Sequence, residues 1–165
     1  MKTSKIKQLS NFKRVASNIS LKSTNSFKIR DFFKTNDNGG IFIYVNDDIF
    51  QWFNHEVKNS PVKELASYEF ITDITEQKIF GDARTVGIYE EVDFAHIKQI
   101  CERHITKGER LLKYNGRANL FWVRDKIGTL REVNVHWITD GWRVFVHGFI
   151  PSRGWYAGDI SFFHN

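Results

Sequence analysis

Three residues in the C-terminal third of the chain have side chains suited to acid–base chemistry: Glu132, His136 and His147. Imidazole titrates near neutral pH, and a carboxylate can fix its tautomer through a hydrogen bond. We therefore interpret Glu132 and His147 as a candidate acid/base pair, with His136 as an orienting group or second base. This interpretation supports a small hydrolase or isomerase. The same donors are of the types that bind zinc or iron, but we predict no metal site and no cofactor.

A second interpretation of the same segment is a surface that binds planar ligands. Aromatic rings on a sheet can stack with the bases of single-stranded nucleic acid, and polar groups at their edge can orient the ligand. The sequence lacks the signature motifs of RNA-recognition modules and of zinc fingers, so this interpretation depends on side-chain types alone. The residues assigned to it are Phe121, Asn134, Arg143, Phe145, Phe149 and Trp155.

The first 30 residues are strongly basic. They contain eight Lys and Arg residues and no acidic one, whereas the rest of the chain contains 16 basic and 19 acidic residues. Such a segment is attracted to phosphate backbones by a force that salt weakens. We predict a flexible arm over residues 1–30 that contacts RNA or another polyanion through Lys5, Lys7, Lys13 and Arg14. Import into an organelle or export by a secretion system is an alternative use of a basic, Ser-rich segment.

These features together predict a small binding module. Its basic arm would contact RNA or a ribonucleoprotein surface, and its aromatic and polar sheet face would add a second contact. The enzyme described above is one alternative. An immunity or inhibitor protein that acts by protein–protein contact is another, because the body of the chain is mildly acidic.

Composition predicts one folded domain over residues 31–165. Of the 165 residues, 41% are hydrophobic and 15% aromatic, which is enough to form a sizeable core. No window approaches the roughly 18 uncharged apolar residues that a membrane-spanning helix needs. Cys101 is the only cysteine, which excludes an internal disulfide and favours a reducing, cytoplasmic location.

Hydrophobic periodicity predicts the elements that position the candidate residues. Apolar residues recur every 3.6 residues over 93–113, which indicates one long amphipathic helix with Asp93 as its N-cap. Alternating apolar residues indicate strands after this helix, and cap residues indicate short helices before it. The expected strands span residues 118–125, 130–139, 142–150 and 159–163.

Two turns define the expected strand pairing. The Asp-Gly pair at 140–141 predicts a two-residue turn with Thr139 opposite Trp142, and a four-residue loop after the first strand places Trp122 opposite Val133. The valines then face the long helix. The opposite face is expected to carry Phe121, Glu132, Asn134, His136, Arg143, Phe145, His147 and Phe149.

The predicted fold class is α+β: a long amphipathic helix packed on a C-terminal antiparallel meander of about four strands, preceded by short helices. In order and pattern, residues 93–163 resemble the cystatin-like and nuclear-transport-factor-like architectures. This resemblance implies a curved sheet that wraps a helix and leaves a pocket, without implying an activity. The loop over 153–158 would form a ligand lid or close the open end of the sheet.

Overall fold

The computed structural model describes residues 11–58, 60–85 and 91–164. Its main feature is a seven-stranded sheet with the strand order β1-β5-β11-β7-β8-β9-β3. β11 is parallel to β7 and β3 is parallel to β9, whereas the other neighbours are antiparallel. The strands are β1 (Phe12–Leu21), β3 (Tyr44–Val45), β5 (Lys63–Phe70), β7 (Ala118–Arg124), β8 (Leu130–Ile138), β9 (Gly141–Gly148) and β11 (Ile160–His164).

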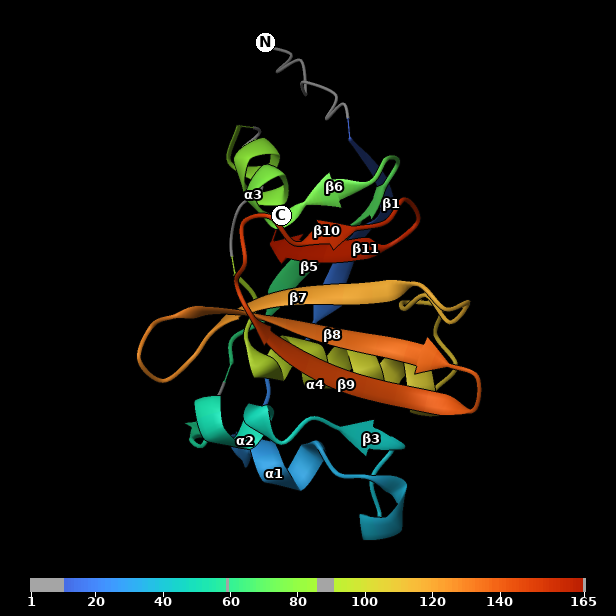
Figure 1. The fold of residues 1–165 in the computed structure, drawn as a ribbon. Coiled ribbons are helices and arrows are strands. Elements are labelled where there is room, and N and C mark those ends of the chain that lie inside the picture. The colour runs from blue at the N-terminus through green and yellow to red at the C-terminus, as the bar shows by residue number, and fades with distance from the viewer. Residues whose placement is uncertain (1–10, 59, 86–90, 165) are drawn as a thin grey trace, which may run out of the picture.

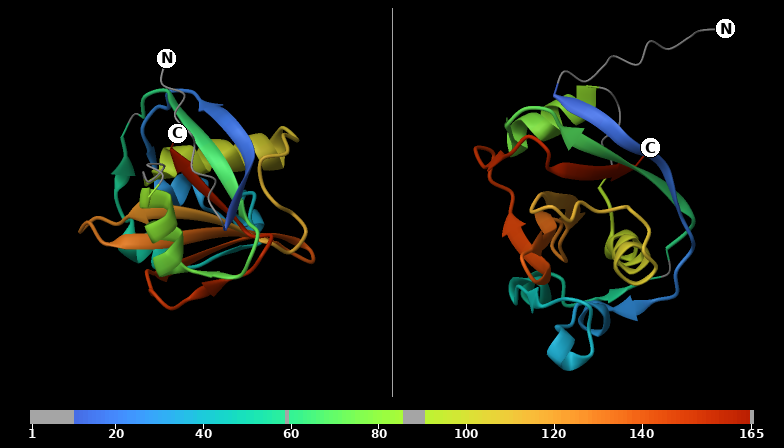
Figure 2. Two further views of the ribbon diagram at one scale, coloured as in Figure 1. Left: turned by 90° about the horizontal axis from the view of Figure 1, so that it is seen from above. Right: turned by 90° about the vertical axis from the view of Figure 1, so that its right-hand side faces the viewer.

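Short helices and two-residue strands complete the fold (Figure 1). β2 pairs with β4, and β10 pairs with β6. Helix α4 lies inside the curve of the large sheet, as the right-hand view of Figure 2 shows. These elements are β2 (Phe27–Lys28), α1 (Ile29–Phe32), η1 (Asn36–Asn38), α2 (Asp48–Trp52), β4 (Glu56–Val57), β6 (Ile74–Thr75), α3 (Glu76–Thr85), α4 (Phe94–Cys101), η2 (Glu102–Thr106) and β10 (Gly154–Trp155).

The prediction of one long helix over 93–113 was wrong at its C-terminal half. The N-terminus is as expected, because the Asp93 side chain accepts the backbone N–H of His96 and the His96 ring accepts that of Asp93. The π-helical turn η2 then ends the helical path. His104 Nδ1 accepts the backbone N–H groups of Leu111 and Leu112, each at 3.1 Å. These bonds fold the following residues back, and hydrophobic periodicity does not reveal them.

The fold-class prediction was also wrong, because the sheet is much larger than a four-stranded meander. β7, β8 and β9 form where expected and pair as consecutive hairpins. β11 lies beside β7, however, instead of beside β9. β5 and β1 extend the sheet beyond β11. The protein is therefore a large, mostly antiparallel mixed sheet with short helices, held by pairings between residues far apart in sequence.

Much of the segment expected as a flexible arm is part of this sheet or packs near it. β1 occupies residues 12–21 and pairs with β5, and β2 and α1 occupy residues 27–32. Two register shifts interrupt β1, and Asn18 has a left-handed φ of 56°, which asparagine tolerates better than most residues. Lys5 and Lys7 lie outside the described residues.

The expected register between β7 and β8 was wrong by one residue. Phe121, instead of Trp122, lies opposite Val133. A shift of one residue exchanges the faces of a strand. Phe121 therefore lies on the face that packs against α4, and Trp122 lies on the other face.

The expected register between β8 and β9 was shifted by two residues. Trp137 pairs with Trp142, so the turn residues are Thr139 and Asp140. Gly141 belongs to the strand, where a Cβ atom would come within 2.5 Å of the Ile43 side chain. Because the shift is even, the side chains of both strands keep their expected faces.

Two hydrophobic clusters lie on the two faces of the sheet. The inner cluster surrounds α4 and includes Phe121, Val133 and Phe162. The other cluster lies between the sheet and α3 and includes Phe80 and Trp122. We call the face that α3 contacts the outer face.

Candidate functional site

The outer face of β7, β8, β9 and β3 carries most of the polar residues predicted to be chemically active. Strand pairing aligns its side chains in three rows. Glu132 lies directly opposite His147, so the structure brings the candidate acid/base pair together. His136 is two rows away from them. The rows are Trp122, Glu132 and His147; Leu120, Asn134 and Phe145; and Ala118, His136, Arg143 and Tyr44.

Glu132 belongs to a buried ionic cluster. Its side chain is not exposed, and its Oε2 accepts a hydrogen bond from Arg153 Nη1 at 3.1 Å. The same nitrogen lies 3.5 Å from Oε1 of Glu76, a fully buried residue at the start of α3. Glu76 Oε2 accepts the backbone N–H of Ile150 at 2.7 Å. One guanidinium group therefore faces two buried carboxyl groups.

This cluster changes the proton affinity of its members. Burial raises the pKa of Glu132 to about 8; the Glu76 carboxyl group adds to the rise, and Arg153 opposes it. Burial likewise raises the pKa of Glu76. Burial lowers the pKa of His147, Arg153 lowers it further, and Asp48 opposes this. Burial therefore favours the protonated, uncharged form of Glu132 and the uncharged form of the His147 imidazole.

Three partly exposed rings lie next to one another beside the cluster. The Phe145 ring centroid lies 5.4 Å from that of Tyr44 and 6.5 Å from that of His147. The Phe145 and His147 rings are nearly parallel, with 4° between their planes, and Tyr44 is tilted by 38°. Tyr44 is 40% exposed, and the other two side chains are half-buried. We call these three residues the stacking face.

Polar atoms without partners adjoin the stacking face. Arg143 pairs with Tyr44 across β9 and β3, and its Nη2 donates to Asp140 at 3.3 Å. Arg143 Nε and Asn134 Oδ1 are buried and have no hydrogen-bond partner within the described part of the chain. Unpaired buried groups are uncommon in folded proteins. The unpaired donor, Arg143 Nε, lies on β9 with Phe145 and His147, and the unpaired acceptor, Asn134 Oδ1, lies on β8 directly opposite Phe145.

The other aromatic residues assigned to ligand binding do not join this surface. Phe121 is on the inner face, where it stacks with Phe162 at a centroid distance of 4.5 Å. Phe149 packs against Phe80 at 5.4 Å. Trp155 belongs to β10 and packs against the cluster under α3. The structure thus separates these rings from Phe145.

The remaining candidate residues lie at the edges of the sheet. Lys13 and Arg14 are exposed on β1, at the opposite edge from β3, and the Arg14 guanidinium lies 5.9 Å from the Tyr68 ring centroid. His136 Nε2 is 2.8 Å from the carbonyl oxygen of Gly116. His136 also lines a hollow of about 500 Å³.

Comparison with other proteins gives no assignment for this site. No protein-family model, no curated protein and no solved structure matches the chain. In the described ranges, no helix is long and apolar enough to cross a membrane. The same ranges contain no group of three or more His, Cys, Asp or Glu side chains that could hold a metal ion. A function must therefore be inferred from the geometry of the residues.

Three residues of the site were not identified from the sequence: Tyr44, Glu76 and Arg153. Tyr44 stands in the apolar run over 41–45, where its phenol group is the one sign of a partly exposed position. Glu76 stands in the first turn of a helical segment, as many exposed glutamates do, and Arg153 stands in a loop. Their proximity to Glu132 depends on long-range packing, so no local pattern indicates it.

Proposed function

We propose that this protein is a small binding module that binds single-stranded RNA through the stacking face. The observation that supports the proposal is the alignment of three partly exposed rings along one edge of the sheet. Tyr44, Phe145 and His147 succeed one another at 5.4 and 6.5 Å. Successive bases of a single strand can stack on such rings without sequence preference, because every base has an aromatic face.

The polar surroundings of the rings favour a nucleic acid over an uncharged planar ligand. Arg143 is a permanent cation beside Tyr44, and its partner Asp140 is exposed. A guanidinium group pairs well with a phosphate. The exposed Lys13 and Arg14 on β1 would supply a second, salt-sensitive contact with the polyanion.

The enzyme alternative has one supporting observation, the direct pairing of Glu132 with His147. A catalytic acid must contact its substrate. The Glu132 side chain is completely buried and already hydrogen-bonded to Arg153. We therefore favour a structural role for Glu132 and a binding role for the rings next to it.

The test is binding of a fluorescently labelled single-stranded RNA of about 12 nucleotides, measured by fluorescence polarisation at low salt. Alanine in place of Phe145 or Tyr44 should weaken binding by roughly 5- to 150-fold, because one stacked base contributes about 1–3 kcal/mol. Tyr156→Ala is the matched control, since Tyr156 is a 65% exposed tyrosine outside the stacking face.

Circular dichroism and melting temperature should show that these variants fold. Wild-type protein that does not bind the RNA would overturn the proposal. Equal affinity of the Y44A/F145A double variant and the wild type would also overturn it, because binding would then occur elsewhere on the protein.

A further inference from the structure

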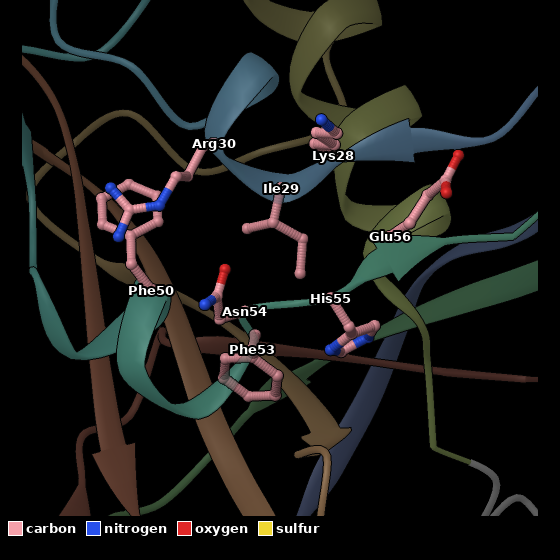
Figure 3. Close-up of a pocket in the computed structure, with 8 residues that line it drawn as sticks. All are labelled: Lys28, Ile29, Arg30, Phe50, Phe53, Asn54, His55 and Glu56. Carbon is pink, nitrogen blue, oxygen red and sulfur yellow. The ribbon is translucent and has the colours of Figure 1, made fainter.

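A second candidate binding site lies between α1 and α2, outside the stacking face. It is a cavity of about 350 Å³ formed by the segments β2–α1 and α2–β4 (Figure 3). The antiparallel pairing of β2 with β4 holds the two segments together. We call this cavity the α1–α2 pocket.

The pocket has apolar walls that are fixed by the core. Ile29 and Phe53 line it, and both side chains are buried in the inner cluster. Phe50, on α2, forms another wall and is half-buried. Apolar walls of this kind accept a flat, apolar part of a ligand.

Three basic side chains line the same pocket: Lys28, Arg30 and His55. The Arg30 guanidinium lies 4.5 Å from the centroid of the Phe50 ring. Within the described residues, none of the three has an ion pair or a side-chain hydrogen bond, so their donors are free for a ligand. Glu56 is the acidic residue of the lining, and Figure 3 shows its carboxylate pointing away from the centre.

The combination of walls and charges selects a class of ligand. Free guanidinium and ammonium groups recognise a phosphate, and a guanidinium held over a phenyl ring presents a flat surface on which a base can stack. A volume of about 350 Å³ is at the small end of the range for ligand sites. We propose that the α1–α2 pocket binds a phosphate monoester of a nucleoside, with the base stacked on the Arg30 guanidinium that covers Phe50 and the phosphate at Lys28.

This inference does not depend on the stacking face. The ligand chemistry has two sources, a free mononucleotide and the phosphorylated end of an RNA strand. The test distinguishes them.

Isothermal titration calorimetry with adenosine 5′-monophosphate tests the proposal, with adenosine and inorganic phosphate as partial ligands. The monophosphate should bind at least about tenfold more tightly than either part, because it uses both the cations and the walls. Arg30→Gln and Lys28→Gln should each weaken binding several-fold. Lys126→Gln, which removes an exposed lysine from the β7–β8 loop, should leave binding unchanged.

Competition with oligonucleotides identifies the source. If a 5′-phosphorylated RNA displaces the monophosphate and its 5′-hydroxyl form does not, the pocket binds the phosphorylated ends of RNA strands. If neither RNA displaces the monophosphate, the pocket binds free nucleotides. The Y44A/F145A variant should still bind the monophosphate, which separates this test from that of the stacking face. The inference is overturned if the monophosphate binds no better than phosphate, or if a folded K28Q/R30Q variant binds it as the wild type does.

Discussion

Replacing Glu132 with glutamine is expected to stabilise the protein at about pH 8 and to leave its stability nearly unchanged at about pH 4.5. Glutamine has the shape of the protonated carboxyl group and no charge. The folded protein keeps the Glu132 proton up to about pH 8, because the side chain is buried beside Glu76, whereas an unfolded chain releases it near pH 4.5. Wild-type stability is therefore lost progressively as the pH rises between these two values.

The size of the effect follows from the pKa of Glu132. A tenfold change in proton affinity equals about 1.4 kcal/mol. A rise in pKa from 4.5 to about 8 then corresponds to about 5 kcal/mol of unfolding free energy, which the glutamine variant does not lose. The Arg153 hydrogen bond can be kept by the amide oxygen. His147 titrates in both proteins, so its contribution cancels in the comparison. The repulsion between Glu132 and Glu76 is part of the measured effect, because the glutamine variant lacks it.

Urea denaturation followed by tryptophan fluorescence measures the effect, since the chain has five Trp residues. Both proteins are compared at about pH 4.5 and about pH 8. Glu64→Gln, at an exposed position of β5, is the matched control and should show no such dependence. If E132Q and wild type differ by the same free energy at both pH values, the reasoning is refuted, because Glu132 would then be ionised and paired with Arg153.

Three further predictions concern the sheet, helix α3 and the basic segment. Gly141→Ala should destabilise the protein by about 1–3 kcal/mol in thermal denaturation, because the added Cβ would meet the Ile43 side chain at 2.5 Å. Gly81→Ala should instead stabilise the protein by roughly 0.5–1 kcal/mol, because Gly81 lies within α3 and the added Cβ meets open space. The Lys13→Gln/Arg14→Gln double variant should show a shallower slope of log RNA affinity against log salt concentration. The slope should fall by about 0.7 for each phosphate that the variant no longer neutralises. An unchanged slope would show that β1 does not contact the RNA.

The sequence predicted the positions of three strands well because their signals are local. Alternation and turn residues indicated β7, β8 and β9 at nearly their observed bounds. The same signals could not determine a register to one residue. Gly141 illustrates the reason. The Asp-Gly pair predicts that Gly141 is a turn residue, but Gly141 lies in β9, where its lack of a side chain allows the Ile43 side chain to approach closely.

The candidate site was predictable in part, for the same physical reason. Glu132 and His147 share a face because alternation along a strand determines faces. The partners that decide their chemistry, Glu76 and Arg153, come from α3 and the segment after β9. These contacts depend on how the whole chain packs, and a short stretch of sequence does not indicate them.

The position of β11 has a consequence for how the protein folds. The β7–β8–β9 group can begin to form from hairpin contacts alone, whereas the β1–β5 pair joins it, in the described sheet, through β11. Contacts between distant parts of a chain form slowly, because closing the intervening loop lowers its entropy. Insertion of β11 is therefore expected to be a late folding step. It completes the hydrophobic clusters on both faces of the sheet at once, so the β7–β8–β9 group and the β1–β5 pair are expected to unfold together.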